Sequence, residues 1–115
     1  MASRYGHKFD KVLRVLRKEC PVSKPVRVSI KSLGRQKLCG SCTAYLSAKG
    51  KIESFLIEID SNMSIASAID TLLHEWAHAM DKESNGIPTE PHRNSWGECY
   101  ARTWRVYLGI DSEPV

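Results

Sequence analysis

The sequence predicts an α+β fold in which three helices pack against one small, three-stranded antiparallel sheet. Apolar residues recur every three or four positions in three segments, which is the spacing of amphipathic helices. Between residues 26 and 31 they alternate with polar residues, as in a strand with one buried face. Two further apolar runs, 42–47 and 52–59, flank a short stretch that contains glycine, which is typical of a hairpin.

Length and composition indicate one globular domain covering residues 1–115. The chain is 42% hydrophobic and 26% charged, which excludes a disordered protein, and it is too short for several domains. It contains no apolar run of the roughly 18 residues needed to cross a bilayer, and its first residues lack the apolar core of a signal peptide. We therefore expect a soluble, cytoplasmic protein that does not bind a membrane. In that compartment the four cysteines are expected to be reduced thiols.

The first half of the chain is expected to form a helix and the sheet. The helix covers residues 8–19 and ends before Pro21, which cannot continue it. The first strand begins at Val26, and the two later strands form a hairpin whose turn uses Gly50. The expected apolar face of the helix consists of Phe9, Val12, Leu13, Leu16 and Cys20.

Two longer helices are expected in the second half. The first begins after Asn62 or Ser64 as N-cap and runs for about 18 to 20 residues. The last begins at Ser95, which forms a capping pattern with Glu98, and ends at Gly109. The expected apolar stripe of the first consists of Ile65, Ala68, Ile69, Leu72, Leu73, Trp76 and Met80. The buried face of the last is expected to hold Trp96, Tyr100, Thr103 or Trp104, and Tyr107 or Leu108.

The first of these helices carries an HExxH sequence, His74-Glu75-Trp76-Ala77-His78. Residues four apart project from one helix face, so both imidazoles can bind one zinc ion, and Glu75 can hold a water at that ion. The competing interpretation is two histidines on a polar helix face. Three of the four histidines fall between residues 74 and 92, which favours metal binding.

A catalytic zinc site needs a third protein ligand and an open position for water. His92 lies 14 residues beyond His78, in a loop that can fold back over the helix. Glu98 lies 20 residues beyond His78, the spacing of thermolysin-like enzymes, but it also has the capping role. We expect one Zn²⁺ per chain, bound by His74, His78 and His92, with Glu98 as the alternative third ligand.

The segments TLLHEWAHAM and PHRNSWGECYARTWR resemble the SprT-like (Spartan-type) zinc metallopeptidases in a compact, single-domain form, similar to small proteins carried by bacteriophages. The resemblance covers residues 52–107 and implies a minimal zincin-like fold and peptide-bond hydrolysis. The chain departs from the family pattern at Arg93-Asn94-Ser95, where the family usually has Gly-Pro-Glu. By resemblance, the zinc ligands are His74, His78 and His92, the catalytic residue is Glu75, and Trp96 packs against the turn of the third ligand.

The expected reaction is zinc-dependent hydrolysis of a protein or peptide. Glu75 would act as general base toward the attacking water and then protonate the leaving amine. The substrate would lie extended along an exposed sheet edge. Three side chains within about a turn of the site could stabilise the oxyanion or support it: Tyr100, Arg93 and Arg102.

Charge is unevenly distributed and suggests an alternative function. Residues 1–60 contain 13 Lys and Arg against 5 Asp and Glu, whereas residues 61–115 contain 4 against 8. A basic half can attract DNA, through Lys11, Arg14 and Lys18 for example, although it can equally be a solvated surface without aromatic stacking platforms. The alternative is therefore a non-catalytic, zinc-stabilised nucleic-acid-binding module. A second metal or a redox pair at Cys39-Gly-Ser-Cys42 is weakly supported, because a lone CxxC is common.

Overall fold

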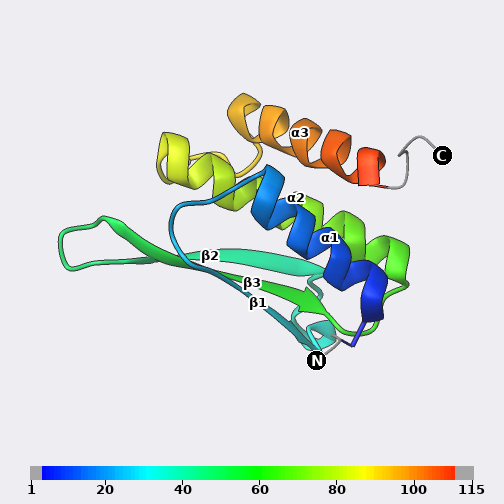
Figure 1. The fold of residues 1–115 in the computed structure, drawn as a ribbon. Coiled ribbons are helices and arrows are strands. Elements are labelled where there is room, and N and C mark those ends of the chain that lie inside the picture. Colours follow the sequence, from blue (N-terminus) through cyan, green and yellow to red (C-terminus); the bar gives the residue numbers. More distant parts are fainter. Residues whose placement is uncertain (1–3, 111–115) are drawn as a thin grey trace.

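The computed structural model describes residues 4–110 and confirms the α+β class. Figure 1 shows the three helices on one side of the sheet, with α2 lying next to the sheet and α3 farther from it. Helix α2 packs on strands β2 and β3, and it also contacts α1 and α3. The elements, in chain order, are α1 (Gly6–Glu19), β1 (Val26–Lys31), the 3-10 turn η1 (Gly34–Gln36), β2 (Gly40–Leu46), β3 (Ile52–Asp60), α2 (Ile65–Asn85) and α3 (Asn94–Ile110).

The sheet is mixed, so the prediction of a fully antiparallel sheet is wrong. Its strand order is β1-β3-β2. The hairpin of β2 and β3 is antiparallel as predicted, whereas β1 pairs in parallel with β3, from Val26 beside Phe55 to Lys31 beside Asp60. The alternation of apolar and polar residues determines which face of β1 is buried, but both pairings satisfy that pattern equally.

The segment between β1 and β2 explains the parallel pairing, because it passes across the end of β3. The backbone N–H of Ser61 donates to the Lys31 carbonyl (3.0 Å), and that of Asp60 donates to the Cys39 carbonyl (2.8 Å). Between these bonds, the Asp60 carboxylate accepts from the N–H of Leu33 (2.9 Å), whose side chain is buried. The end of β3 therefore holds the crossing segment, and β1 and β2 become the two edge strands.

Local signals placed the hairpin turn and the start of α2 correctly. Gly50 has a φ of 79°, a conformation that glycine adopts without steric cost, and Ser47 pairs with Lys51 across the turn. The Ser64 side chain accepts a hydrogen bond from the N–H of Ser67 (3.1 Å), which is an N-cap contact. Of the two predicted caps, Asn62 and Ser64, the structure selects Ser64.

The core lies between the sheet, α1 and α2. Phe9, Val12 and Leu16 of α1 are buried as predicted, and they form one cluster with the inward side chains of β3. Trp76 lies in this cluster, where its indole N–H donates to the carbonyl of Cys20 (2.8 Å), so the largest core side chain has no unpaired polar group. This packing fixes the rotation of α2 about its axis. It therefore also determines which residues of α2 lie on the helix face opposite Trp76.

Three details of the long helices differ from the sequence expectation. Ile65 is exposed, because it is the first residue of α2 and lies beyond the core. Helix α3 begins at Asn94 rather than Ser95, and the Ser95 side chain hydrogen-bonds to Asp81. On α3 the buried residue is Thr103, while Tyr100, Trp104 and Tyr107 are partly buried and Leu108 is exposed. Within residues 4–110, no helix is both long and apolar enough to cross a membrane.

Candidate metal centre

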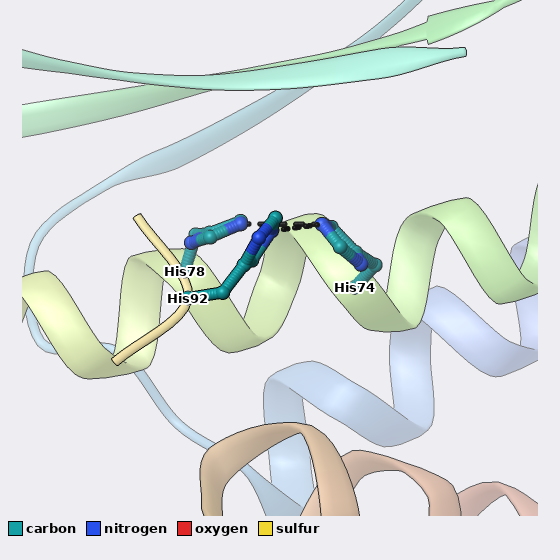
Figure 2. A group of neighbouring side chains, drawn as sticks. All are labelled: His74, His78 and His92. Atoms are coloured by element: carbon teal, nitrogen blue, oxygen red, sulfur yellow. Dashed lines mark hydrogen bonds between the residues drawn. The ribbon is translucent and has the colours of Figure 1, made fainter. Parts of the chain in front are cut away.

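Three histidines from two segments converge at one point. His74 and His78 project from successive turns of α2, and His92 reaches them from the loop before α3 (Figure 2). The Nε2 atom of His74 lies 3.2 Å from Nε2 of His78 and 3.2 Å from Nε2 of His92. One ligand atom from each residue lies within 4.8 Å of the others. The structure thus brings together the three residues that the sequence favoured.

These distances suit a zinc ion. Two nitrogen ligands of a tetrahedral zinc, each about 2.05 Å from the ion, are separated by about 3.3 Å. Burial, reinforced by the proximity of His74, His92 and Lys82, lowers the pKa of His78 to about 4. Burial and His92 also lower the pKa of His74. Both rings are therefore neutral near pH 7, which is the form that binds metal.

A buried carboxylate anchors the loop that carries His92. Asp81 is 1% exposed and accepts hydrogen bonds from Nε of Arg93 (2.7 Å) and Nδ2 of Asn85 (3.0 Å). Burial alone would raise the pKa of Asp81, but hydrogen bonds from Ser95, Arg93 and Asn85 outweigh it and hold this pKa below its usual value. Arg93 and Ser95 are two of the residues at which the sequence departs from Gly-Pro-Glu. In this chain they hold the turn through Asp81.

Replacing Arg93 with glutamine is therefore expected to affect both stability and metal binding. The Asp81 carboxylate would remain buried without its cation, and we expect the free energy of unfolding to fall by about 3 kcal/mol. Zinc affinity should fall with it, because His92 is the adjacent residue. Urea unfolding and a zinc titration measure the two effects, with the exposed Arg105→Gln on α3 as the matched control. An Arg93→Gln variant as stable as the native chain would contradict the anchoring role.

Trp96 packs against all three histidines. Its ring is stacked on that of His78, with the centroids 5.2 Å apart and the planes at 22°, and it lies 4.4 Å from the ring of His92. Its indole N–H donates to the backbone carbonyl of His74 at 3.3 Å. This first turn of α3 restricts how far the imidazoles can rotate, which is the packing that the resemblance implied for Trp96.

Glu75 lies beside the histidines at the edge of a cavity. One carboxylate oxygen, Oε2, is 3.9 Å from Nε2 of His74, and the residue is 7% exposed. Burial raises the pKa of Glu75 to about 7, an effect that the nearby positive charge of Lys82 opposes. A carboxyl with a pKa near neutrality can both take up and release a proton at that pH. The cavity measures about 290 Å³ and is lined by Gly40, Cys42, His74, Glu75, His78, Lys82, Pro88, Pro91 and His92.

Strand β2 reaches this cavity because residue 40 is glycine. A Cβ atom at Gly40 would lie 2.6 Å from Cγ2 of Thr71 and 2.9 Å from the carbonyl oxygen of Glu58, and neither distance is tolerated. The same atom would be 3.4 Å from Cγ of Glu75. The close approach of β2 to α2 therefore requires glycine here, and it makes the edge of the sheet one wall of the site.

The backbone groups of this edge can be assigned from one hydrogen bond. Since the N–H of Asp60 donates to the carbonyl of Cys39, these two residues form a hydrogen-bonded pair of the antiparallel ladder. The following residues alternate, so the backbone groups of Gly40, Cys42 and Ala44 point away from β3. These groups lie on the free edge of the sheet, and Gly40 and Cys42 line the cavity beside Glu75.

The remaining candidates lie farther from the centre or are engaged elsewhere. Glu98 is exposed on α3 and, within residues 4–110, is not part of the histidine group. Arg102 donates to the carbonyl of Glu19 (3.0 Å). Tyr100 lies near the centre, with its ring 5.5 Å from that of His74, but its hydroxyl donates to Asp70.

The two cysteines of the CxxC sequence have different surroundings. Cys39 is exposed, whereas Cys42 is half-buried beside α2. Burial is the main cause that raises the pKa of the Cys42 thiol to about 12, although Lys82 opposes it. A thiol with so high a pKa is a poor nucleophile, which disfavours redox exchange at this pair.

Sequence reasoning missed three contributors to the site: Gly40, Asp81 and Lys82. Only Lys82 carried a readable signal, because it follows His78 by four residues and therefore lies on the same helix face. Comparisons with protein families, with curated proteins and with solved structures found no match for this chain.

Proposed function

We propose that this chain is a zinc-dependent metallopeptidase of the SprT-like type, with a zincin-like arrangement of its active-site helix. The observation that carries the proposal is the convergence of three imidazoles with a buried carboxyl group beside them. His74, His78 and His92 would hold the ion and leave a fourth position open. A purely structural zinc site would have four protein ligands, and no fourth His, Cys, Asp or Glu among residues 4–110 joins this group.

The chain's own residues would have the following roles in the reaction. Bound zinc supplies Lewis acidity, which polarises a carbonyl and lowers the pKa of water toward about 7. Glu75 accepts a proton at its carboxylate oxygen and then delivers it to the nitrogen of the departing amine, a task that suits its pKa of about 7. Trp96 keeps the imidazoles in place during this transfer.

The substrate would be a protein or peptide bound in extended form along β2. The outward backbone groups of Gly40 and Ala44 and the N–H of Cys42 offer hydrogen bonds to such a strand. Gly40 and Cys42 line the cavity beside Glu75. An unfolded or flexible segment meets this requirement, because its backbone is free to pair with a sheet edge. Tyr100, whose ring is next to His74, would stabilise the oxyanion once its hydroxyl exchanges Asp70 for the substrate.

A metal titration tests the zinc binding on which the proposal depends. Protein stripped with a chelator and then given ZnCl₂ is expected to bind one zinc per chain, as measured by elemental analysis. Zinc at a hundred times its Kd should stabilise the fold by about 2.7 kcal/mol, because only the folded chain holds the site. The stripped protein should not cleave an unfolded protein, and adding zinc should restore this activity. Protein that binds no zinc, or two zincs per chain, would contradict the proposed centre.

A second candidate, nucleic-acid binding, is supported by a groove between α1 and α3. Lys11, Lys18 and Arg105 line it, together with the acidic Glu19, and its volume is about 410 Å³. Basic residues from two helices on one groove can follow a phosphate backbone. The candidate is compatible with the peptidase, since the groove and the histidine cavity share no lining residue.

Salt dependence separates this candidate from a merely solvated surface. If the groove neutralises phosphates, the logarithm of the DNA affinity should fall with the logarithm of the salt concentration, with a slope of about −0.9 per phosphate contacted. Reversing Lys11, Arg14 and Lys18 to glutamate should abolish binding and leave the zinc content unchanged. Fluorescence anisotropy with labelled duplex DNA measures both. An absence of binding at low salt would assign these residues to the solvent-exposed surface.

A further inference from the structure

Lys82 lies on the same face of α2 as the histidines, one turn beyond His78. Its ammonium group donates to the backbone carbonyl of Cys42 at 2.7 Å. It lines the cavity beside Glu75 and His78, and its charge acts on the pKa values of both. Lys82 therefore links the active-site helix to the strand edge that borders the candidate metal centre.

The contact with Cys42 takes up one of the donors of the Lys82 ammonium group. An ammonium group has three donors, and within residues 4–110 no carboxylate forms an ion pair with it. Its partner is a neutral carbonyl that belongs to the free edge of β2. A carboxylate is the stronger acceptor, because both partners then carry charge.

We propose that Lys82 is a specificity residue that binds a carboxylate group of the substrate. This inference rests on the proposed peptidase function. The carboxylate is either an acidic side chain near the bond to be cleaved or the C-terminal group of the chain. When this carboxylate replaces the Cys42 carbonyl as the acceptor for the Lys82 ammonium group, that carbonyl becomes available to a substrate N–H. The substrate can then pair with the edge of β2. Recognition of the carboxylate and pairing with the strand are then one event.

Electrostatics of the cavity supports the same assignment. Glu75 is the acidic residue lining the cavity, and its negative charge would repel an acidic substrate. Lys82 is the lysine lining that cavity and offsets this repulsion. Without Lys82, the lining of this cavity would keep the acidic Glu75 and lose the lysine that offsets it. We therefore expect the preference for a carboxylate to depend on Lys82.

The test measures binding separately from cleavage. Zinc-loaded Glu75→Gln protein is titrated with matched pools of unstructured synthetic peptides whose central positions contain Asp and Glu, or Asn and Gln. Each pool is made with a free and with an amidated C-terminus, which distinguishes the two sources of the carboxylate. The same titrations are made with Lys82→Gln and Lys82→Arg added to Glu75→Gln. Lys51→Gln, an exposed lysine in the hairpin turn, is the matched control.

We expect a carboxylate pool to bind about tenfold more tightly than its amide counterpart, as a charge-assisted hydrogen bond provides. Lys82→Gln should remove this difference, Lys82→Arg should keep most of it, and Lys51→Gln should leave it unchanged. Equal affinity for all pools, or a preference that survives Lys82→Gln, would overturn the assignment.

Cleavage by the native chain distinguishes failure of this inference from failure of the proposed function. If the native chain cleaves no pool while Lys82-dependent binding of carboxylates persists, the peptidase proposal fails and the recognition site stands. If the native chain cleaves acidic and amide pools equally, the recognition site fails and the peptidase stands. If Lys82→Gln slows the cleavage of both pools equally, Lys82 acts on the reaction itself and the specificity role is overturned.

Discussion

Replacing Glu75 with glutamine is expected to leave the fold and one zinc per chain intact while lowering the rate of peptide cleavage by at least about 10². Glutamine has almost the same size as glutamate, so it should fit beside His74 as Glu75 does. Its amide cannot accept a proton from water, and it cannot deliver one to the departing amine. Initial rates on an unfolded protein, with zinc content measured on the same samples, provide the comparison.

Two controls make this result specific. Glu53→Gln removes an exposed carboxylate on β3 and should cleave like the native chain. The substrate should be offered with and without DNA, because occupation of the groove between α1 and α3 could be required for activity. If Glu75→Gln cleaves as fast as the native protein under both conditions, Glu75 is not the base, and the zinc-stabilised binding module becomes the better proposal.

Substitution of His92 should have the second largest effect. His92→Ala removes one of three converging donors, and we expect zinc affinity to fall by more than the roughly 10² typical of losing a group that only supports a ligand. Glu98→Gln should retain the metal, because Glu98 is exposed on α3 and lies outside the histidine group. Competition with a chromogenic zinc chelator measures both affinities.

The opposite pattern would indicate a different centre. If Glu98→Gln loses zinc while His92→Ala keeps it, the third ligand comes from α3, as in thermolysin-like enzymes. Such a result would require α3 to rotate, because Trp96 and Thr103 now fix it against α2 through hydrogen bonds to the carbonyls of His74 and Leu73. Far-UV circular dichroism should show that both variants keep the native helix content.

Features that depend on neighbouring residues could be predicted from the sequence. The apolar spacing of Phe9, Val12 and Leu16 indicated α1, and two candidate caps, Asn62 and Ser64, marked the start of α2 to within two residues. The same reasoning placed His74 and His78 on one helix face, because residues four apart are adjacent in any α-helix. Gly50 likewise marked its turn. Each of these features follows from backbone geometry within a few residues.

The tertiary structure decided whatever depends on how distant segments cross. Strand β1 lies beside β3, and Asp60 holds Leu33 across the end of the sheet. No alternation of apolar residues contains that information. The three residues after His92 gave no sign of a stable turn. Asp81, buried on α2, supplies the partner that Arg93 needs, because a buried carboxylate must be paired.

The same distinction holds at the candidate metal centre. Local spacing paired two histidines and placed Glu75 next to them, whereas the contacts of His92 with His74 and of Lys82 with Cys42 depend on long-range packing. Gly40 gave no signal, since its role is the absence of a side chain where β2 meets α2. Periodicity in a sequence reports which face of an element is buried. Which residue lies opposite that face is determined by the free energy of packing the whole chain.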